Sequence, residues 1–392
     1  MAALAQPAGQ QVETTETFQR VTDIQNVVVR HHPEEFTAWP ANNGLWSWDA
    51  GAEILVGFTS GRYVERNGHK IADEHRNGLA RSTDGGLTWS ALSPANFADD
   101  RLSAIPLTNA IDFNAPGFAL RVCGMGYHGS TRLKAPCLYY SYDRGNTWKG
   151  PFLFGGLDRM SEIEGSTAIT PRTDYLVLGP RECLVFASAT SGPFLDKSFV
   201  IRSTDGGLSF SFWSWVVPRS DPYRAVMSQT VRTREKELIS VMRRRDRPGK
   251  PSECWIDAYG SMDGGKSWSF RSRVAYTGFG NSNGNPPAMT RLRDGRLLVV
   301  YGNRSLQMIL CRLSADGGRT WGQEIILRDD FLKGDNDFAD FGYPRVVQRA
   351  DGKVVALYYF ATEKRREQHI ACSIFSLDNL QEVEVQRSMT PP

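Results

Sequence analysis

The stretch Ser261 to Trp268, which reads SMDGGKSW, decides the fold because near copies of it recur along the chain. Every copy keeps a serine, an aspartate two residues later, a glycine two residues after that, and an aromatic residue at its end. Such repeats have to be recognised first, since a missed repeat misassigns the whole fold. The other copies are STDGGLTW at 82–89, SYDRGNTW at 141–148, STDGGLSF at 203–210 and SADGGRTW at 314–321.

Each copy follows an alternating apolar segment and carries the chemistry of a tight turn between two strands. Asp-Gly-Gly and Asp-Arg-Gly favour a hairpin, because the aspartate accepts backbone hydrogen bonds within its own turn and glycine tolerates positive φ. The copies recur about every 55 to 60 residues, a period that fits one four-stranded sheet, and the chain length then gives about six sheets. The sequence therefore predicts an all-β fold, a six-bladed β-propeller with four-stranded antiparallel blades.

The two ends of the chain suggest how the ring closes. The sixth expected turn, Ser376 to Leu380, has lost the glycines and the tryptophan. The segment Val21 to Arg30 has strand character and precedes the first blade, so we expect it to pair with blade six and close the ring. Residues 18–392 then form one propeller domain, without a capped helix of 3.6-residue period. Residues 1–17 are expected to be a disordered tail or the remnant of an export signal.

The composition is that of an ordinary globular protein, with 41% hydrophobic residues and a net charge of +3. The near balance of 46 basic and 43 acidic residues argues against nucleic acid as a partner. No apolar run approaches the roughly 20 residues that cross a bilayer, so no membrane partner is expected. An export signal would place the protein in the periplasm or outside the cell, which we slightly favour.

Cysteine and metal-ligand patterns give no sign of a metal centre. The six cysteines are scattered singly, without a CxxC pair or a histidine at metal-ligand spacing. We therefore expect buried free thiols, with Cys123 and Cys137 as the locally plausible bridge. An oxygen-rich run from Asp329 to Asp340 lacks the spacing of a calcium loop. No metal and no cofactor are expected.

The repeats resemble the Asp boxes of the sialidase superfamily, and the resemblance covers the chain from about Phe36 to Phe375. In that family the Asp boxes lie on the outer rim of the propeller and also occur in non-enzymatic propellers, so they imply the fold rather than the function. The family's active site lies on the propeller axis. There, three arginines bind the substrate carboxylate, a tyrosine paired with a glutamate is the nucleophile, and an aspartate is the acid/base.

Position by position, the chain resembles only part of that site. Arg243, at the end of LISVMR, matches the second arginine, Arg304 in YGNR matches the third, and Tyr343 in FGYPR matches the tyrosine. The first arginine is replaced by Ala38, and Gln229 stands where the glutamate is expected. The resemblance therefore implies a divergent member that does not cleave sialic acid by the standard route.

Acid/base chemistry requires groups whose pKa lies near the working pH, so histidines and carboxylates are the first candidates. The family's aspartate should lie in the loop 59–76, which offers Asp73 and His75. His128 lies in the glycine-rich turn GMGYHG, and Glu164 opens blade three. The alternative for both histidines is an exposed loop position without a chemical role. The predicted catalytic residues are Tyr343, Glu164, His128, His75 and Asp73, with Glu253 and Asp340 as secondary carboxylates.

Arginine suits bidentate carboxylate recognition because its planar fork matches two oxygens, and sugar rings stack on aromatic side chains. For Arg243 and Arg304 the alternative is a structural ion pair, and for the tryptophans it is core packing. The neighbouring Arg244, Arg245 and Arg247 are expected at a solvated edge. The predicted substrate-binding residues are Arg243, Arg304, Arg62, Arg345, Trp39, Trp46 and Trp48.

Taken together, the residues predict a glycoside hydrolase that cleaves a terminal acidic or deoxy sugar from a glycan at the propeller axis. One alternative is a lyase that eliminates beside a uronate carboxylate with a histidine and a tyrosine, such as His128 and Tyr343. Another alternative is a non-catalytic glycan-binding propeller. In each case the partner is an oligosaccharide or glycan.

Overall fold

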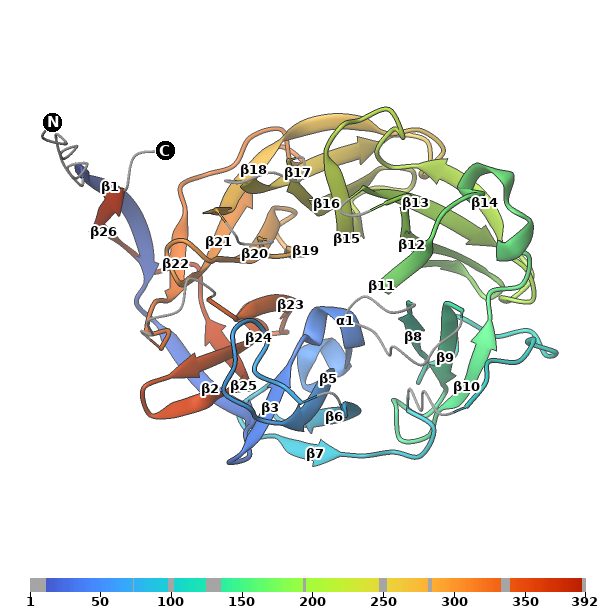
Figure 1. Cartoon of the computed structure of the whole chain (residues 1–392), viewed down its shortest axis with the longest axis horizontal. Coiled ribbons are helices and arrows are strands. Elements are labelled where there is room, and N and C mark those ends of the chain that lie inside the picture. The colour runs from blue at the N-terminus through green and yellow to red at the C-terminus, as the bar shows by residue number, and fades with distance from the viewer. Residues whose placement is uncertain are drawn as a thin grey trace, which may run out of the picture.

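Six β-sheets surround a central axis in the computed structural model, as Figure 1 shows. The structure describes residues 12–72, 74–97, 102–124, 135–192, 195–246, 252–280, 284–332 and 339–389. The strand pairs within the sheets are antiparallel, as in blade 3, except for the parallel pair of β1 (Val12–Val21) and β22 (Ile325–Arg328). The predicted six-bladed β-propeller is therefore confirmed, although the number of strands differs between blades.

Blades 1 and 2 depart from the predicted four strands. Blade 1 consists of β3 (Glu35–Ala38), β4 (Leu45–Trp48), β5 (Glu53–Arg62), β6 (Arg76–Ser82) and β7 (Ser90–Leu92). Blade 2 has three strands among the described residues, β8 (Ala119–Cys123), β9 (Cys137–Ser141) and β10 (Lys149–Leu153). A short helix that the sequence did not predict, α1 (Pro40–Asn43), follows β3 and lies near the centre of the ring in Figure 1. The 3₁₀ turn η1 (Asp49–Gly51) links β4 to β5.

Blades 3 and 4 have the predicted four strands. Blade 3 consists of β11 (Ala168–Gly179), β12 (Glu182–Thr190), β13 (Asp196–Ser203) and β14 (Ser211–Trp215). Blade 4 consists of β15 (Arg224–Arg232), β16 (Leu238–Arg245), β17 (Ser252–Ser261) and β18 (Ser269–Gly280). Two 3₁₀ turns, η2 (Leu157–Arg159) and η3 (Ser161–Ile163), connect β10 to β11.

Blades 5 and 6 contain the two ends of the described chain. Blade 5 consists of β19 (Ala288–Arg291), β20 (Leu297–Asn303), β21 (Met308–Ser314) and β22 (Ile325–Arg328), extended by β1 (Val12–Val21) and β26 (Leu380–Met389). Blade 6 consists of β23 (Gly342–Gln348), β24 (Val354–Thr362), β25 (Arg365–Phe375) and β2 (Ile24–Arg30).

The ring closes as the sequence predicts, because β2 pairs antiparallel with β25, with Val27 opposite Cys372. The chain before β2 differs from the prediction. Strand β1 pairs antiparallel with β26 over its full length and parallel with β22, and Figure 1 shows β1 and β26 extending outward from the ring. Residues 12–17 therefore lie in a paired strand and not in the predicted tail.

The repeated turns share backbone hydrogen bonds to the aspartate and to the serine, illustrated by the box at 82–89, which also has an indole bond that the box ending in Phe210 lacks. Oδ1 of Asp84 accepts the backbone N–H of Thr88 at 2.9 Å, while Oγ of Ser82 accepts the N–H of Gly86 at 2.8 Å. Nε1 of Trp89 donates to the carbonyl of Gly86 at 2.8 Å. Boxes also bond to the preceding blade: Oγ of Ser214 in blade 3 donates to the carbonyl of Gly265 at 2.5 Å, and Oγ of Ser272 in blade 4 donates to that of Gly318 at 2.7 Å. The boxes therefore fasten hairpins and pack adjacent blades together.

Buried apolar residues fill the spaces between blades, and the cysteines belong to this core. All six cysteines are buried free thiols. Cys123 and Cys137 stand opposite each other on β8 and β9, without a disulfide between them. None of the helices in the described part of the chain is long and apolar enough to cross a membrane.

Candidate active site

Bulges on the innermost strands aim side chains toward the propeller axis. Trp39, Thr173, Met227 and Tyr343 all have φ between 49° and 62°, a left-handed conformation that is uncommon outside glycine. The last three lie where the pairing register shifts in β11, β15 and β23. A bulge inserts an extra residue and re-aims the side chains beside it. Strand alternation alone would not predict where these side chains point.

Tyr343 and Arg243 meet at the axis. Nη1 of Arg243 donates to Oη of Tyr343 at 3.2 Å, and both side chains are buried. The backbone N–H of Tyr343 donates to Oδ1 of Asn285 at 2.9 Å. Gly342 has φ of 103°, and a Cβ there would collide with the side chain of Asn285. Glycine at 342 thus lets Asn285 hold the bulge that carries Tyr343.

A second chain of contacts joins Arg304 to the loop of blade 1. Nη2 of Arg304 donates to Oη of Tyr359 at 3.3 Å and lies 3.7 Å from Oδ1 of Asp340. Tyr359 donates its own hydrogen to that oxygen at 2.5 Å. The other carboxylate oxygen of Asp340 lies 2.9 Å from Nδ1 of His69. We call Arg243, Arg304, Asp340, Tyr343, Tyr359 and His69 the axial cluster.

The electrostatics of the axial cluster favour an ionised Asp340. Although burial works against the charged form, His69, Arg304 and the hydroxyl of Tyr359 lower the pKa of Asp340 below its usual value. Burial and the charge of Asp340 raise the pKa of Tyr359 well above its usual value. An ionised carboxylate can only accept hydrogen bonds, so Nδ1 of His69 is the donor. In the neutral imidazole with its hydrogen on Nδ1, the other nitrogen, Nε2, is the acceptor.

Trp39 covers one side of the cluster. Its ring centroid lies 5.0 Å from that of His69 in an edge-on arrangement and 6.3 Å from that of His75. A cavity of about 640 Å³ lies beside this contact, and His75 and Arg62 are among its lining residues. The loop predicted to approach the site therefore does so, with His69 nearest to the carboxylate.

Arg345 lies at the axis but is bound to protein groups. It donates to the backbone carbonyls of Ala41 and Arg172 at 2.6 Å each, and also to the side-chain oxygen of Gln229. Burial lowers the pKa of Arg345 to about 10. Gln229 in turn donates to Asp174 at 3.3 Å. This network joins α1, blade 3, blade 4 and blade 6, so Arg345 has a structural role where the sequence predicted sugar binding.

Trp46 and Trp48 pack between blades 1 and 2 and do not join the axial cluster. Trp46 is buried, its Nε1 donates to the carbonyl of Leu120 at 3.2 Å, and its ring lies 5.2 Å from that of Trp148. Trp48 is packed against the same group of buried residues. The core alternative considered for these tryptophans therefore describes them better than a sugar platform.

Glu164 is also separate from the axial cluster. It is exposed and lines a different cavity, formed by the segment between β10 and β11, which lies toward the outer edge of the ring in Figure 1. Asp73 and His128, the remaining predicted catalytic residues, lie outside the described residues.

The predicted solvated edge at Arg244 and Arg245 is wrong, because both side chains are buried. Arg244 reaches Asp221 at 2.8 Å and Asp257 at 3.3 Å, while Arg245 donates to Ser252 at 3.1 Å. Consecutive residues of β16 point to opposite faces, which separates Arg244 from Arg243. Arg247 lies outside the described residues.

Two members of the axial cluster were missed from the sequence. His69 lies in the loop 59–76 that the resemblance singled out, but no spacing distinguished it from its neighbours. Tyr359 lies in an apolar strand, where a tyrosine is usually read as core. Asp340, named as a secondary carboxylate, is the residue that links them. Among the described residues, no group of three or more histidines, cysteines or acids could hold a metal ion.

Comparison with known proteins agrees with the architecture. Residues 106–356 match the BNR repeat-like domain family. A protein of unknown function from Dyadobacter fermentans has a TM-score of 0.66 at 20% identity, over 91% of this chain and 99% of that one. An α-L-arabinanase from Penicillium chrysogenum, solved with arabinobiose, has a TM-score of 0.58 at 13% identity, over 92% and 100% of the two chains.

The NanB sialidase from Streptococcus pneumoniae has a TM-score of 0.50 at 12% identity, over 88% of this chain and 70% of that one. At such identities the likeness of these structures shows the fold alone. The family match confirms the repeats predicted from the sequence, and the low identities make this chain a divergent member of the fold. No curated protein matches the sequence.

Proposed function

The chain belongs to the BNR repeat-like domain family, and we propose that it is a glycoside hydrolase that takes a terminal sugar into the axial cluster. The observation that carries the proposal is the meeting, at the axis, of two guanidinium groups, two phenols and a carboxylate–imidazole pair from four blades. Distant structural relatives that are glycoside hydrolases support the same class of reaction.

Arg243 and Arg304 are proposed to bind an anionic group of the sugar. Both are buried, where a guanidinium interacts with an anion more strongly than it does in water. Their planar forks match a carboxylate, so an acidic sugar is the favoured substrate. The edge of Trp39 offers an apolar surface beside this position.

His69 and Tyr343 are proposed to carry the chemistry. Asp340 holds the imidazole of His69 in one tautomer, which prepares Nε2 to exchange a proton with the glycosidic oxygen. Tyr343 is the proposed nucleophile: its oxygen bonds to the anomeric carbon as the glycosidic bond breaks, and its proton passes through Nε2 of His69 to the leaving oxygen. Water then attacks the anomeric carbon, which releases the sugar and restores the phenol. Negative charge on the tyrosine oxygen would lie beside the guanidinium of Arg243 at 3.2 Å. His69 thus takes the acid/base role expected of an aspartate in the same loop.

Elimination beside a uronate carboxylate is the second candidate, favoured by the contact between His69 and Asp340. In that reaction the imidazole removes the proton next to the carboxylate while the arginines neutralise the developing charge. The tyrosine then protonates the leaving oxygen. The product is unsaturated, which distinguishes it from a hydrolysis product.

A panel of sialylated, uronate-containing, rhamnose-capped and arabinose-containing oligosaccharides tests the proposal by mass spectrometry. Products whose summed mass exceeds that of the substrate by one water establish hydrolysis. Products without added water overturn it in favour of elimination, and saturable binding without any product would instead identify a glycan-binding propeller.

Two variants test the assigned residues on the substrate found. His69→Gln and Tyr343→Phe are each expected to lower kcat by about 10² to 10⁴-fold, the usual contribution of a proton-transfer group. The matched controls are His31→Gln, which removes a contact with Glu367, and Tyr358→Phe, which removes a contact with Ser373. Equal activity of a cluster variant and its control would remove that residue from the mechanism.

A further inference from the structure

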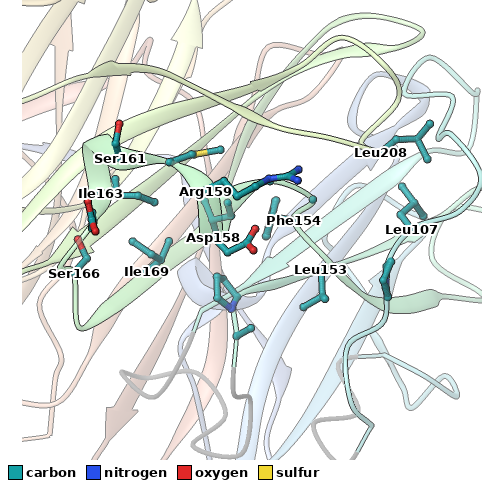
Figure 2. A pocket seen from close by; sticks show the side chains of 18 residues that line it. Leu107, Leu153, Phe154, Asp158, Arg159, Ser161, Ile163, Ser166, Ile169 and Leu208 are labelled. Atoms are coloured by element: carbon teal, nitrogen blue, oxygen red, sulfur yellow. The ribbon is translucent and has the colours of Figure 1, made fainter.

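A cavity of about 720 Å³ lies at the junction of blades 2 and 3, in the segment that carries η2 and η3. Figure 2 shows Leu107, Leu153, Phe154, Ile163, Ile169 and Leu208 around it. Its volume falls in the range of small-molecule sites, and a mainly apolar lining with a few polar groups is the composition such sites have. None of the residues that line it belongs to the axial cluster.

In the described part of the chain, three charged side chains line this cavity, namely Asp158, Arg159 and Glu164. Asp158 and Arg159 are drawn among the apolar side chains in Figure 2. All three are exposed, and no hydrogen bond or ion pair joins their side chains to any other part of the chain that the structure describes. These three side chains can therefore contact a ligand at little cost in free energy, because no ion pair within the protein has to be broken first.

The lining argues against a sugar and for a more apolar ligand. Glycans are held by broad aromatic faces and many hydrogen-bonding groups. Among the lining residues that the structure describes, Phe154 is the single aromatic residue and aliphatic side chains predominate. Among the described lining residues, two carboxylates and one guanidinium give a net negative charge, which favours a cation.

We propose that this cavity is a binding site for a small amphipathic cation, a molecule with an aromatic or alkyl body and an amine. The body rests on Phe154, Ile163 and Ile169, and the amine lies beside Asp158 and Glu164. The site is separate from the axial cluster, so the proposal does not depend on the proposed reaction.

Three probes of one shape test the proposal by isothermal titration calorimetry on the full chain: 2-(2-naphthyl)ethylamine, the matching neutral alcohol, and the matching carboxylate. The amine is expected to bind more tightly than the alcohol, and the carboxylate least. The double variant Asp158→Asn, Glu164→Gln is expected to weaken amine binding by about five- to ten-fold, the sum of two exposed ion pairs. The alcohol should be unaffected.

Controls separate this site from general surface charge. Glu235→Gln removes an exposed acid outside the cavity and should leave amine binding unchanged. Ser166→Trp is expected to fill the cavity and abolish binding of all three probes. Equal binding of amine and alcohol, an effect of Glu235→Gln as large as that of the double variant, or full binding to Ser166→Trp would each overturn the proposal.

Discussion

The rim and the axis of this propeller are built in opposite ways. At the rim, five turns repeat the same contacts between residues two to four positions apart, as in the bond from Ser267 to Asp263. At the axis every contact is different and joins distant segments, such as His69 to Asp340, which are 271 positions apart. Local repeats therefore form the scaffold, whereas the candidate chemistry depends on how the blades are brought together.

The largest expected effect on stability is at the axis. Arg345→Met removes the donors to three backbone carbonyls of neighbouring elements and to Gln229, and it removes a positive charge that acts on Asp174. Breaking such a buried network is expected to lower the free energy of unfolding by about 3 to 5 kcal/mol. Denaturant titration measures it, with Arg293→Met as the exposed control that should cost less than about 1 kcal/mol. Similar losses in both variants would contradict a structural role for Arg345.

The pH dependence of stability should have opposite signs in the two regions. Burial raises the pKa of Asp174 to about 7, despite hydrogen bonds from Thr230 and Ser228 that favour the charged form. In the unfolded chain an aspartate titrates near 3.8. The folded state therefore holds the proton more tightly, and the stabilising contribution is lost as the pH rises from about 4 to about 7.

At the rim the sign is reversed. Burial works against ionisation, but the hydrogen bonds from the hydroxyl and backbone N–H of Ser267, from Ser261 and from the N–H of Lys266 together outweigh it and lower the pKa of Asp263 to about 2. This contribution is present above about pH 4 and is lost as the pH falls toward 2. Denaturant unfolding of the wild type, Asp174→Asn and Asp263→Asn at several pH values from 2 to 7 measures both effects. Each variant should lose the contribution of its own aspartate to the pH dependence of the free energy of unfolding. If both variants lost a contribution of the same sign, the expected contrast in pH dependence between the axis and the rim would be wrong.

A smaller effect is expected when one rim turn is broken. Asp263→Ala removes the acceptor for the backbone N–H groups of Lys266 and Ser267. The expected loss is about 1 to 2 kcal/mol in the free energy of unfolding, and Asp84→Ala should cost the same because its turn has the same contacts. A loss several-fold larger in one turn than in the other would show that the repeats are not equivalent.

The smallest effect is expected at the degenerate sixth turn. Ser376 still donates to Asp378 at 2.7 Å, but the glycines and the tryptophan are absent. Asp378→Ala should change the free energy of unfolding by less than about 0.5 kcal/mol, as for an ordinary surface position. Denaturant titration of Asp378→Ala and Asp263→Ala checks this. Equal losses in the free energy of unfolding would mean that the sixth turn is stabilised as strongly as the five intact ones.

Much of the fold could be predicted because hairpin turns depend on neighbouring residues. The five turns, the ring of six blades and its closure by β2 followed from such patterns. Strand counts were less predictable, since β1 and β26 gain stability from pairing with each other and carry no turn signature. The helix α1 was missed because a single turn leaves no period in the sequence.

The candidate site was only partly predictable. Arg243, Arg304 and Tyr343 do meet at the axis, and Asp340 joins them. His69 and Tyr359 could not be distinguished from other loop and core residues, because their roles follow from their distance to Asp340. Trp46 and Glu164 carried suitable chemistry but lie between blades 1 and 2 and beside a separate cavity.

Residue order alone was enough to predict the repeated hairpins and the propeller, because a turn brings together residues that are already neighbours in the chain. The axial cluster was decided only by the closed ring, since its members come from four blades and one of them, Tyr343, lies at a bulge. Whether a buried charge binds a ligand or a neighbouring carbonyl depends on that packing, as the contrast between Arg243 and Arg345 illustrates.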